Sequence, residues 1–344
     1  MHHREKQIRV ATVGAFGHWV FVLDEIVGMK EVDLVGAVPA LPGESVNNVL
    51  AHDAMSNGVP TFDDYHLLLK AAKPDVVILS CRLDRIPVLA MELAQAGCDL
   101  ICEKPLALDL HTLDKLHQVI ETTGVRLMAM LSMRADPVFQ TARRLYRSGA
   151  IGEVALTNAR KSYKYGVRPE WFGARKTYGG TMSWVGIHAL DMIHFITGQS
   201  FTSVAAIQKN FAHPDRPDCE DSIAAVFGLA NGGSATVSAD LLRPAAAATH
   251  GDDWIRVVGT KGIIEARSND GVVRLLRDGV EAELIPPDPV RPMYRPFLLR
   301  EKTNDPLLQP DDAFLLTQAC LCARDAADAG VVANIPAIYN MGAR

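Results

Sequence analysis

Five short apolar runs, separated by helical stretches, occupy the first third of the chain and limit its possible folds more than any other feature. They are IRVATVG (8–14), VDLVGAV (32–38), DVVILS (75–80), CDLICE (98–103) and VRLMAML (125–131). Continuous apolar runs are typical of parallel strands whose two faces are both covered. The intervening stretch RIPVLAMELAQAG (85–97) has leucines at helical spacing and ends on a glycine suited to a helix C-cap. The pattern predicts α/β structure with a doubly wound, parallel (Rossmann) sheet.

After about residue 150 the pattern changes to strands joined by turns. The tripeptides NGG (231–233) and NDG (269–271) are hairpin signals, so we expect a large, mainly antiparallel sheet. The stretch 311–330 predicts a final helix that packs back on the body, with acidic residues at its positive dipole end. The sequence thus predicts two domains, 1–130 and 131–344.

Composition narrows the possible partners. The formal net charge is -5 and no basic block is present, which argues against nucleic acid and membranes and favours a small-molecule ligand. We find neither an apolar run of about eighteen residues nor a signal peptide, so we expect a cytosolic protein. Six cysteines without recurring Cys-x-x-Cys pairs indicate reduced thiols rather than disulfides or zinc.

The segment ICEKPLAL (101–108) places charged residues where a buried strand should stop. Ligands of a doubly wound sheet bind beyond the carboxyl ends of its strands, so Glu103 and Lys104 are expected at a site. Pro105 ends strand pairing and fixes the backbone after the lysine. A lysine beside a nicotinamide can hydrogen-bond a substrate hydroxyl and help to remove its proton. The alternative is a solvated lysine at a strand-helix junction.

Four segments in the same order resemble the Gfo/Idh/MocA oxidoreductases, which act on sugars, inositols and related polyols with NAD or NADP. They are PDVVILS with AMELAQAGCDLICEKPLAL, SMRADPVFQTARRLYRSGAIGEV (132–154), GGTMSWVGIHALDMIHFITG (179–198) and VVGTKGIIEA (257–266). The resemblance implies an N-terminal nicotinamide-binding domain, a C-terminal substrate-binding α/β domain and a site between them. It also implies a homo-dimer or homo-tetramer formed through the open sheet. Lys104 and His188 align with the catalytic lysine and histidine of the family.

The first turn departs from the family pattern. Where the family has Gly-x-Gly-x-x-Gly or Ala, VGAFGHWV places Gly14, Phe16 and Trp19, with an extra Gly17. Dinucleotide binding then requires a shifted or widened turn. The acidic residue expected after the second strand is absent, so NAD cannot be distinguished from NADP. The resemblance implies the following cofactor-binding residues: Gly14, Phe16, Gly17, His18, Ser80, Arg85, Glu103 and Lys104.

The catalytic element departs as well. Trp184 stands where the family commonly has an aspartate, four residues before His188, while Asp191 lies one helical turn beyond it. Imidazole titrates near neutral pH and remains a candidate base. His188 has a structural alternative as a helix cap, and Asp191 as the partner of an arginine or a backbone amide. A metal site with His194 is not expected, because residues six apart lie about 120° apart around a helix.

Several polar and aromatic residues are expected near the substrate. The predicted substrate-binding set is Lys104, Arg134, Lys161, Trp171, Trp184, His188 and Asp191. A wider basic cluster with Tyr163, Tyr165, Arg168 and Lys176 suits a hydroxylated or anionic substrate. The alternative for the basic residues is a solvated face, and the alternative for the aromatic residues is a position in the core.

Two functions are compatible with these features. The first is an NAD(P)-dependent oxidoreductase acting on a CH-OH group of a sugar, sugar acid or cyclitol-like molecule, with Lys104 and His188 handling the hydroxyl proton. The second is a family member without dehydrogenase activity that binds a ligand or partner, in which Phe16 and Trp19 fill the nucleotide pocket.

Overall fold

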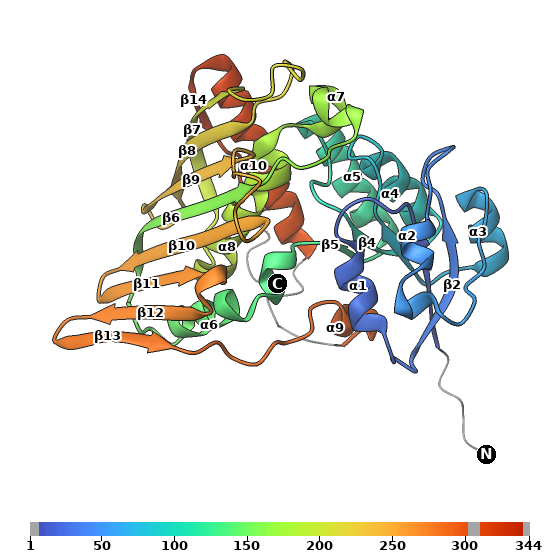
Figure 1. Cartoon of the computed structure of the whole chain (residues 1–344), viewed down its shortest axis with the longest axis horizontal. Helices are drawn as coiled ribbons and strands as arrows, with labels where there is room; N and C mark the ends of the chain where they lie inside the picture. Colours follow the sequence, from blue (N-terminus) through green and yellow to red (C-terminus); the bar gives the residue numbers. More distant parts are fainter. Residues whose placement is uncertain (1–6, 302–309, 340–344) are drawn as a thin grey trace. The chain divides into compact units, whose positions relative to one another are not determined.

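The computed structural model describes residues 7–301 and 310–339 (Figure 1). Contacts within the chain define two compact units. The first consists of Met1–Met130 with Pro292–Ala313, and the second of Leu131–Arg291 with Phe314–Arg344. Each unit is described by itself below, and the domains 1–130 and 131–344 stay a prediction.

The first unit contains a five-stranded parallel sheet. Its strands are β1 (Ile8–Val13), β2 (Val32–Val38), β3 (Val76–Leu79), β4 (Asp99–Cys102) and β5 (Leu127–Ala129). Their spatial order is β2-β1-β3-β4-β5, so the strand order reverses between β1 and β3. Ligands of such sheets bind at this reversal, beyond the carboxyl ends of the strands. The predicted parallel sheet is confirmed. It could be predicted because strands buried on both faces are continuous apolar runs in the sequence.

Short helices connect these strands. They are α1 (Trp19–Ile26), α2 (Asn47–Leu50), η1 (Asp53–Met55), α3 (Tyr65–Ala72), α4 (Ile86–Gln95) and α5 (Leu110–Thr123). The carboxylates of Asp64 and Asp109 accept backbone N–H groups at the starts of α3 and α5, as N-caps do. Helix α4 ends at Gln95 and has Ala96 as its C-cap residue, one residue before the predicted cap; Gly97 follows with a φ of 85°.

A segment distant in sequence completes the first unit. Helix α9 (Arg295–Leu298) begins where the Glu25 carboxylate on α1 accepts the backbone N–H groups of Met293, Tyr294 and Arg295 at 2.7–2.8 Å. The Arg126 guanidinium also donates to the carbonyl of Phe297 at 2.8 Å. These bonds attach the segment after residue 291 to the parallel-sheet unit.

The second unit contains a nine-stranded sheet. Its strands are β6 (Val154–Tyr163), β7 (Phe201–Lys209), β8 (Ser222–Leu229), β9 (Ser234–Asp240), β10 (Gly251–Gly259), β11 (Gly262–Arg267), β12 (Val272–Arg277), β13 (Val280–Ile285) and β14 (Val332–Asn334). The spatial order is β13-β12-β11-β10-β6-β9-β8-β7-β14, with β6 and β9 as its parallel pair. The predicted mainly antiparallel sheet is confirmed, and NGG and NDG connect neighbouring strands as expected.

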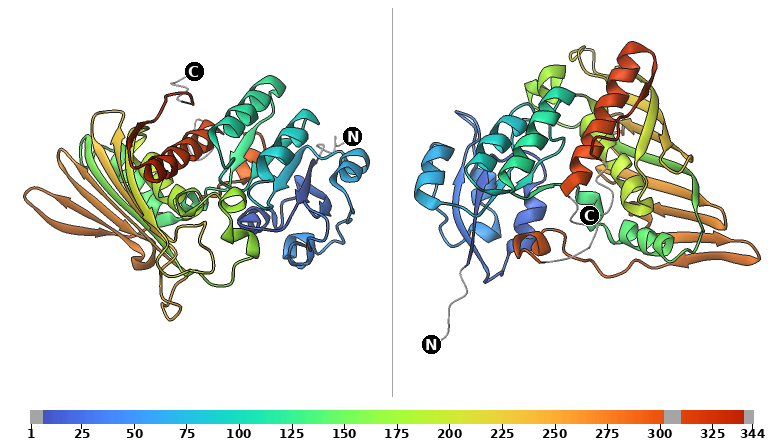
Figure 2. Two further views of the ribbon diagram at one scale, coloured as in Figure 1. Left: turned by 90° about the horizontal axis from the view of Figure 1, so that it is seen from above. Right: turned by 180° about the vertical axis from the view of Figure 1, so that it is seen from behind.

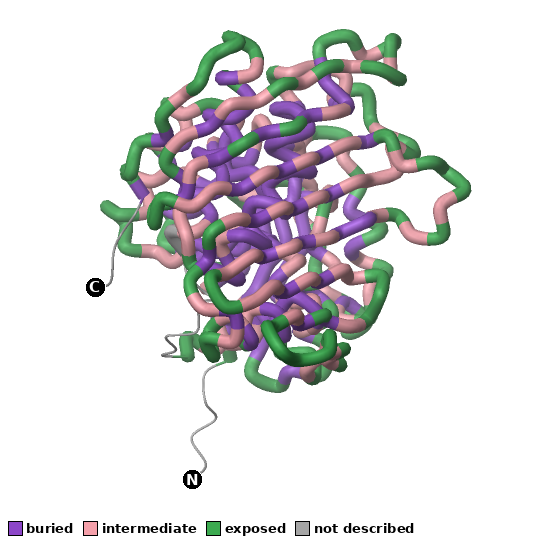
Figure 3. The backbone as a smooth tube through the Cα atoms, turned by 90° about the vertical axis from the view of Figure 1, so that its left-hand side faces the viewer, coloured by how far each residue is buried: buried purple, intermediate pink, exposed green. Residues whose placement is uncertain are grey.

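Helices of the second unit gather on one face of this sheet. They are α6 (Pro137–Arg147), α7 (Arg175–Tyr178), α8 (Ile187–Thr197) and α10 (Pro310–Ala329), with short turns η2 (Ser132–Ala135), η3 (Glu170–Gly173), η4 (Met182–Gly186) and η5 (Ser268–Asp270). Figure 2 shows α8 and α10 on the same face, and α8 packs directly against β6. In the described residues the opposite face carries no helix, and buried and partly exposed positions alternate along its strands (Figure 3). We call this the outward face.

The predicted final helix is confirmed as α10, within one residue of its expected bounds. Among the residues that the structure describes, no helix is both long enough and apolar enough to cross a membrane.

Candidate functional site

The turn after β1 brings two strand ends together where the strand order reverses. Gly14 has a φ of 80°, and a Cβ there would lie 2.4 Å from the carbonyl oxygen of Ser80, the residue after β3. That oxygen accepts the N–H of Phe16 at 2.9 Å, while the Ser80 hydroxyl donates to the Phe16 carbonyl. Only glycine fits position 14, and the turn is tied to β3 at this point.

The second half of the turn rests on Glu103. Its carboxylate accepts the backbone N–H of His18 at 2.5 Å and lies 3.0 Å from the His18 Nδ1; it also accepts the N–H of Lys104 at 2.9 Å. Gly17 has a φ of 99°, and a Cβ there would lie 1.9 Å from the Glu103 Oε2. Position 17 therefore requires glycine, because a side chain there would collide with the Glu103 carboxylate.

The charge of Glu103 is stabilised although its side chain is fully buried. Burial raises the pKa of Glu103, but the nearby His18, the hydrogen bonds from His18 and the Lys104 ammonium outweigh burial and hold that pKa below its ordinary value. Glu103 therefore acts as an ionised anchor for the turn.

Trp19 starts helix α1 and does not close the turn. Its ring N–H donates to the carbonyl of Ala15 at 3.1 Å, and its edge meets His52 with ring centres 6.0 Å apart. Trp19 is buried, whereas Gly17 stays exposed. The indole thus lies against the turn at Ala15 and against His52, and Gly17 remains exposed.

Ser80, Arg85 and Lys104 occupy the ends of neighbouring strands. Arg85 is the N-cap residue of α4, five residues after Ser80, and is partly buried. Lys104 follows Glu103 directly after β4, and its side chain is fully buried. Strands β3 and β4 are paired, so these predicted cofactor-binding residues lie at one edge of the sheet.

His188 lies at the start of helix α8 in the second unit, after a π-helical turn. That turn, Met182–Gly186, contains Trp184 and is buried throughout, and π-helical turns occur often at functional sites. His188 is fully buried, and Trp184 meets the Phe172 ring edge-on with centres 5.8 Å apart. The predicted catalytic element is therefore a buried, locally irregular helix start.

Arg134 and Asp191, both predicted to bind substrate, bind each other. The Arg134 Nε and Nη2 donate to the Asp191 Oδ1 at 2.8 and 2.6 Å, and both side chains are buried. The guanidinium also lies 5.6 Å from the centre of the Phe195 ring. This is the structural alternative that the sequence left open for Asp191, and direct contact with substrate stays a prediction for both residues.

Lys161 is paired with an aspartate that the sequence did not indicate. Its ammonium lies 2.5 Å from the Asp253 Oδ1 and 2.8 Å from the Met133 sulfur. Lys161 and Asp253 are opposite residues of β6 and β10, and both point to the helix-covered face. Burial raises the pKa of Asp253, and Lys161 opposes that rise. Only the register of these strands reveals the pair, because 92 residues separate its members.

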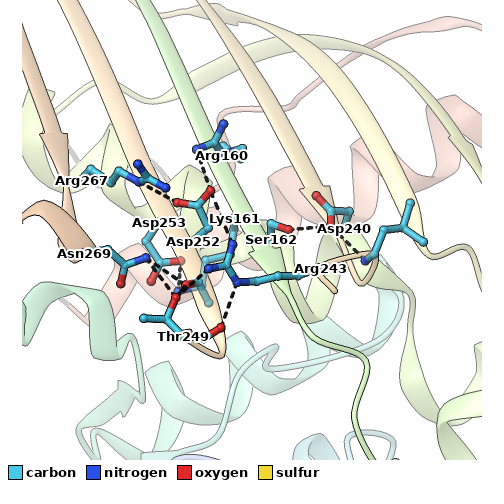
Figure 4. Close-up of polar contacts among 12 residues, drawn as sticks. Arg160, Lys161, Ser162, Asp240, Arg243, Thr249, Asp252, Asp253, Arg267 and Asn269 are labelled. Carbon is cyan, nitrogen blue, oxygen red and sulfur yellow. Dashed lines mark hydrogen bonds and ion pairs between the residues drawn. The ribbon is translucent and has the colours of Figure 1, made fainter. Parts of the chain in front are cut away.

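The neighbouring Asp252 serves the other face of β10 (Figure 4). It accepts the Arg160 Nη2 at 2.7 Å and the Arg267 Nε at 2.9 Å. Successive side chains of a strand point to opposite faces, so two adjacent aspartates belong to two different ion-pair systems.

The remaining aromatic residues lie in the segment after β6. Trp171 packs on Phe172 with ring centres 4.5 Å apart, and Phe172 packs on the buried Tyr178 at 4.4 Å. Trp171 stays partly exposed. The core alternative therefore fits Tyr178, and Trp171 retains a surface for a ligand. Within the described ranges, no group of three or more His, Cys, Asp or Glu residues is arranged to hold a metal ion.

Two family models match successive parts of the chain. Residues 8–131 match the oxidoreductase family with an NAD-binding Rossmann fold, and residues 139–265 match the GFO/IDH/MocA C-terminal domain. A solved structure from Thermotoga maritima, assigned as an oxidoreductase, is 32% identical with a TM-score of 0.89; the match covers 95% of this chain and 100% of that one.

Curated relatives align over shorter stretches. Inositol 2-dehydrogenase of Rhizobium meliloti is 30% identical over 202 residues, which is 58% of either chain. D-glucoside 3-dehydrogenase of Escherichia coli is 31% identical over 144 residues, 40% of either chain. The aligned part thus spans little more than half the length of these relatives at most.

Proposed function

Because the chain belongs to the Gfo/Idh/MocA oxidoreductase family, we propose that it transfers hydride between a nicotinamide cofactor and a hydroxyl or keto group of a sugar, sugar acid or cyclitol. The observation that carries this proposal is the turn after β1. It is held by a buried, ionised Glu103 that is followed in sequence by Lys104.

The residues of the first unit fit a dinucleotide. Gly14 and Gly17 carry no side chain at the two positive-φ positions of the turn, and Gly17 remains exposed. Phe16, His18, Ser80 and Arg85 complete the predicted cofactor-binding set around this turn. The nicotinamide, when bound, accepts or supplies the hydride. NAD and NADP both remain compatible with these residues, and the cytosolic location stays a prediction.

The protein's own part in the reaction is to move a proton. During oxidation of an alcohol the hydroxyl loses its proton. We assign the removal of this proton to the Lys104 amine and the His188 imidazole. Because Trp184 stands in place of an aspartate, the carboxylate that usually assists the catalytic histidine is missing four residues before His188. Other neighbours must then orient the His188 imidazole.

The non-enzymatic alternative has little structural support. It requires Phe16 and Trp19 to fill the nucleotide pocket, but the Trp19 indole donates to the Ala15 carbonyl and packs against His52. Gly17 is exposed rather than covered.

A second copy of the chain is the proposed protein partner, through the outward face. A shallow groove there is lined by small and apolar residues of β7, β8, β9 and β14, and Ile207, Val226 and Val332 are 81%, 54% and 75% exposed. Exposed apolar surface of this kind is typical of an interface. Val226→Lys should convert the oligomer to monomer in light scattering, whereas Val280→Lys, at an exposed valine outside the groove, should not.

Binding of NADH and NADPH, followed by nicotinamide fluorescence, tests the cofactor assignment. Saturable binding of either supports the oxidoreductase, and a screen of sugars and cyclitols for NAD(P) reduction then follows. Lys104→Met and His188→Asn should each lower kcat about 10²- to 10⁴-fold, and His188→Asn should leave the NADH affinity little changed. A folded protein that binds neither cofactor would contradict the proposal.

A further inference from the structure

Arg168 lies in the segment directly after β6 and has a charge that the protein does not neutralise. Across residues 7–301 and 310–339, no carboxylate lies within ion-pair distance of its guanidinium. Its Nη2 makes a long bond of 3.4 Å to the Lys164 carbonyl, and its Cζ lies 5.1 Å from the centre of the Phe172 ring. The Nε is buried without a hydrogen-bond partner in the described residues.

Three other partly or fully buried arginines of the same unit each form an ion pair. Arg134 is paired with Asp191 at 2.6 Å, Arg175 with Glu220 at 3.0 Å and Arg267 with Asp252 at 2.9 Å. Removing a charge from water without a partner is costly, and an arginine offers five donors in a planar fork. An arginine left in this state indicates a missing anion.

Among the described residues, the groups that act electrostatically on Arg168 include no carboxylate. Its electrostatic neighbours are the phenols of Tyr163, Tyr165 and Tyr178, which are neutral near pH 7. Burial lowers the pKa of Arg168 below its ordinary value. His250, whose ring lies 4.8 Å from that of Tyr163, completes the group.

Additional cations reinforce this positive environment. Burial, followed by Arg168, Lys161 and Lys164, lowers the pKa of His250, so His250 is neutral near pH 7. The Lys164 ammonium donates to the Ala247 carbonyl and has no ion pair in the described part of the chain. The carboxylates that act on the neighbouring phenols are already paired: Asp253 with Lys161, Glu220 with Arg175 and Asp215 with Arg216. A ligand that supplies an oxyanion would relieve this local excess of positive charge.

We propose that Arg168, with the hydroxyls of Tyr163 and Tyr165, binds an oxyanion, a carboxylate or a phosphate, carried by the substrate. The segment of Arg168 continues β6, and helix α8 with His188 packs against the same strand. Guanidinium groups bind both oxyanions through paired N–H donors. This inference rests on the proposed function and narrows its substrates from neutral polyols to acidic or phosphorylated sugars.

Three probes that share one ring test the inference: D-glucose, D-glucuronate and D-glucose 6-phosphate, with the galactose series beside them. Binding to the full-length protein is measured by calorimetry with and without NADH. We expect a charged sugar to bind about 10- to 100-fold more tightly than its neutral counterpart. The better of the two charged probes identifies the oxyanion as carboxylate or phosphate.

Arg168→Gln should remove the preference for charged sugars and leave the affinity for the neutral sugar unchanged. Arg168→Lys should recover part of the preference. Arg144→Gln, which breaks a surface pair with Asp288, is the matched control and should change nothing. A measurement independent of sugar shape is the rise in Tm in inorganic phosphate over chloride at equal ionic strength, which should be smaller in Arg168→Gln than in the natural protein.

Equal affinities for charged and neutral sugars, or an equal phosphate effect on the Tm of both proteins, would overturn the inference. Intact NADH binding with no anion preference means that the substrate class alone is wrong. Anion binding at Arg168 without NADH binding means that the proposed function is wrong and the oxyanion site is not.

Discussion

Glu103 and Arg168 are charged residues that the two units of the molecule treat in opposite ways. Glu103 is buried, and its carboxylate is occupied by N–H groups of the turn after β1. Arg168 is partly buried, and no carboxylate of the described residues meets it. A charge satisfied inside the protein fixes backbone geometry, whereas a charge left unsatisfied is available to a ligand. The difference teaches that charge and burial do not identify a ligand-binding group until its internal partners are known.

The Arg134–Asp191 pair offers the strongest test, because it is the paired counterpart of Arg168 in the same unit. Asp191→Asn should lower the free energy of unfolding by about 3–5 kcal/mol, since it leaves a buried guanidinium without its counter-charge. Urea unfolding measures the loss. The double variant Arg134→Met/Asp191→Leu should recover much of it; equal losses in both proteins would mean that side-chain volume, not charge, is responsible.

Removing the charge of Glu103 should have the next largest effect. Glu103→Gln keeps the shape but weakens the bonds to the N–H groups of His18 and Lys104, so we expect a loss of about 2 kcal/mol and weaker NADH binding. Glu121→Gln, at an exposed glutamate of α5, is the control and should match the natural protein. An unchanged NADH affinity in Glu103→Gln would show that the anchor does not matter to the cofactor.

Gly17 tests the same turn through its backbone. Gly17→Ala adds a Cβ at a φ of 99° against Glu103 and should cost about 1–3 kcal/mol together with most of the NADH affinity. Gly28→Ala also has a positive φ, 78°, but nothing lies within 4 Å of its Cβ. Gly28→Ala should therefore lose stability only and bind NADH normally, which separates backbone strain from contact with the anchor.

Acid should weaken the turn. The pKa of Glu103 in the folded protein lies below its ordinary 4.5, so the stabilisation is complete above pH 4.5 and falls as the pH drops through the folded pKa. NADH affinity measured against pH should decline in this acid range. The decline should be shallower in Glu103→Gln, and identical profiles would assign it to another carboxylate.

Arg168→Gln should have the smallest effect on folding. Because the guanidinium has no ion-pair partner to lose and its burial is itself costly, the free energy of unfolding should fall by less than about 0.5 kcal/mol. Urea unfolding beside Asp191→Asn provides the comparison. A loss as large as that of Asp191→Asn would show that Arg168 is structural after all.

Much of the fold could be predicted because its signals are local. The buried strands of the first unit are continuous apolar runs, and NGG and NDG mark two hairpins of the second unit directly. The positions of Glu103 and Lys104 at the end of β4 could also be predicted, because an apolar run shows where its strand stops.

The partners of these residues could not be predicted. The contact between His18 and Glu103 spans 85 residues, and the pairing of Lys161 with Asp253 depends on the register between β6 and β10. The sequence suggested that Trp19 obstructs the turn, because a bulky residue replaces a glycine there. The ring actually donates to the Ala15 carbonyl and packs against His52, which lies in a distant part of the sequence.

The adjacent aspartates of β10 make this strand intolerant of the insertion or deletion of a single residue. Asp252 and Asp253 face opposite sides of the sheet, so deletion or insertion of one codon within the strand would exchange their positions. A single reading-frame-preserving change would then place the carboxylate of each ion-pair system on the wrong side. Length variation among homologues should accordingly be found in the connection 243–250, before the strand begins, and not between residues 251 and 259.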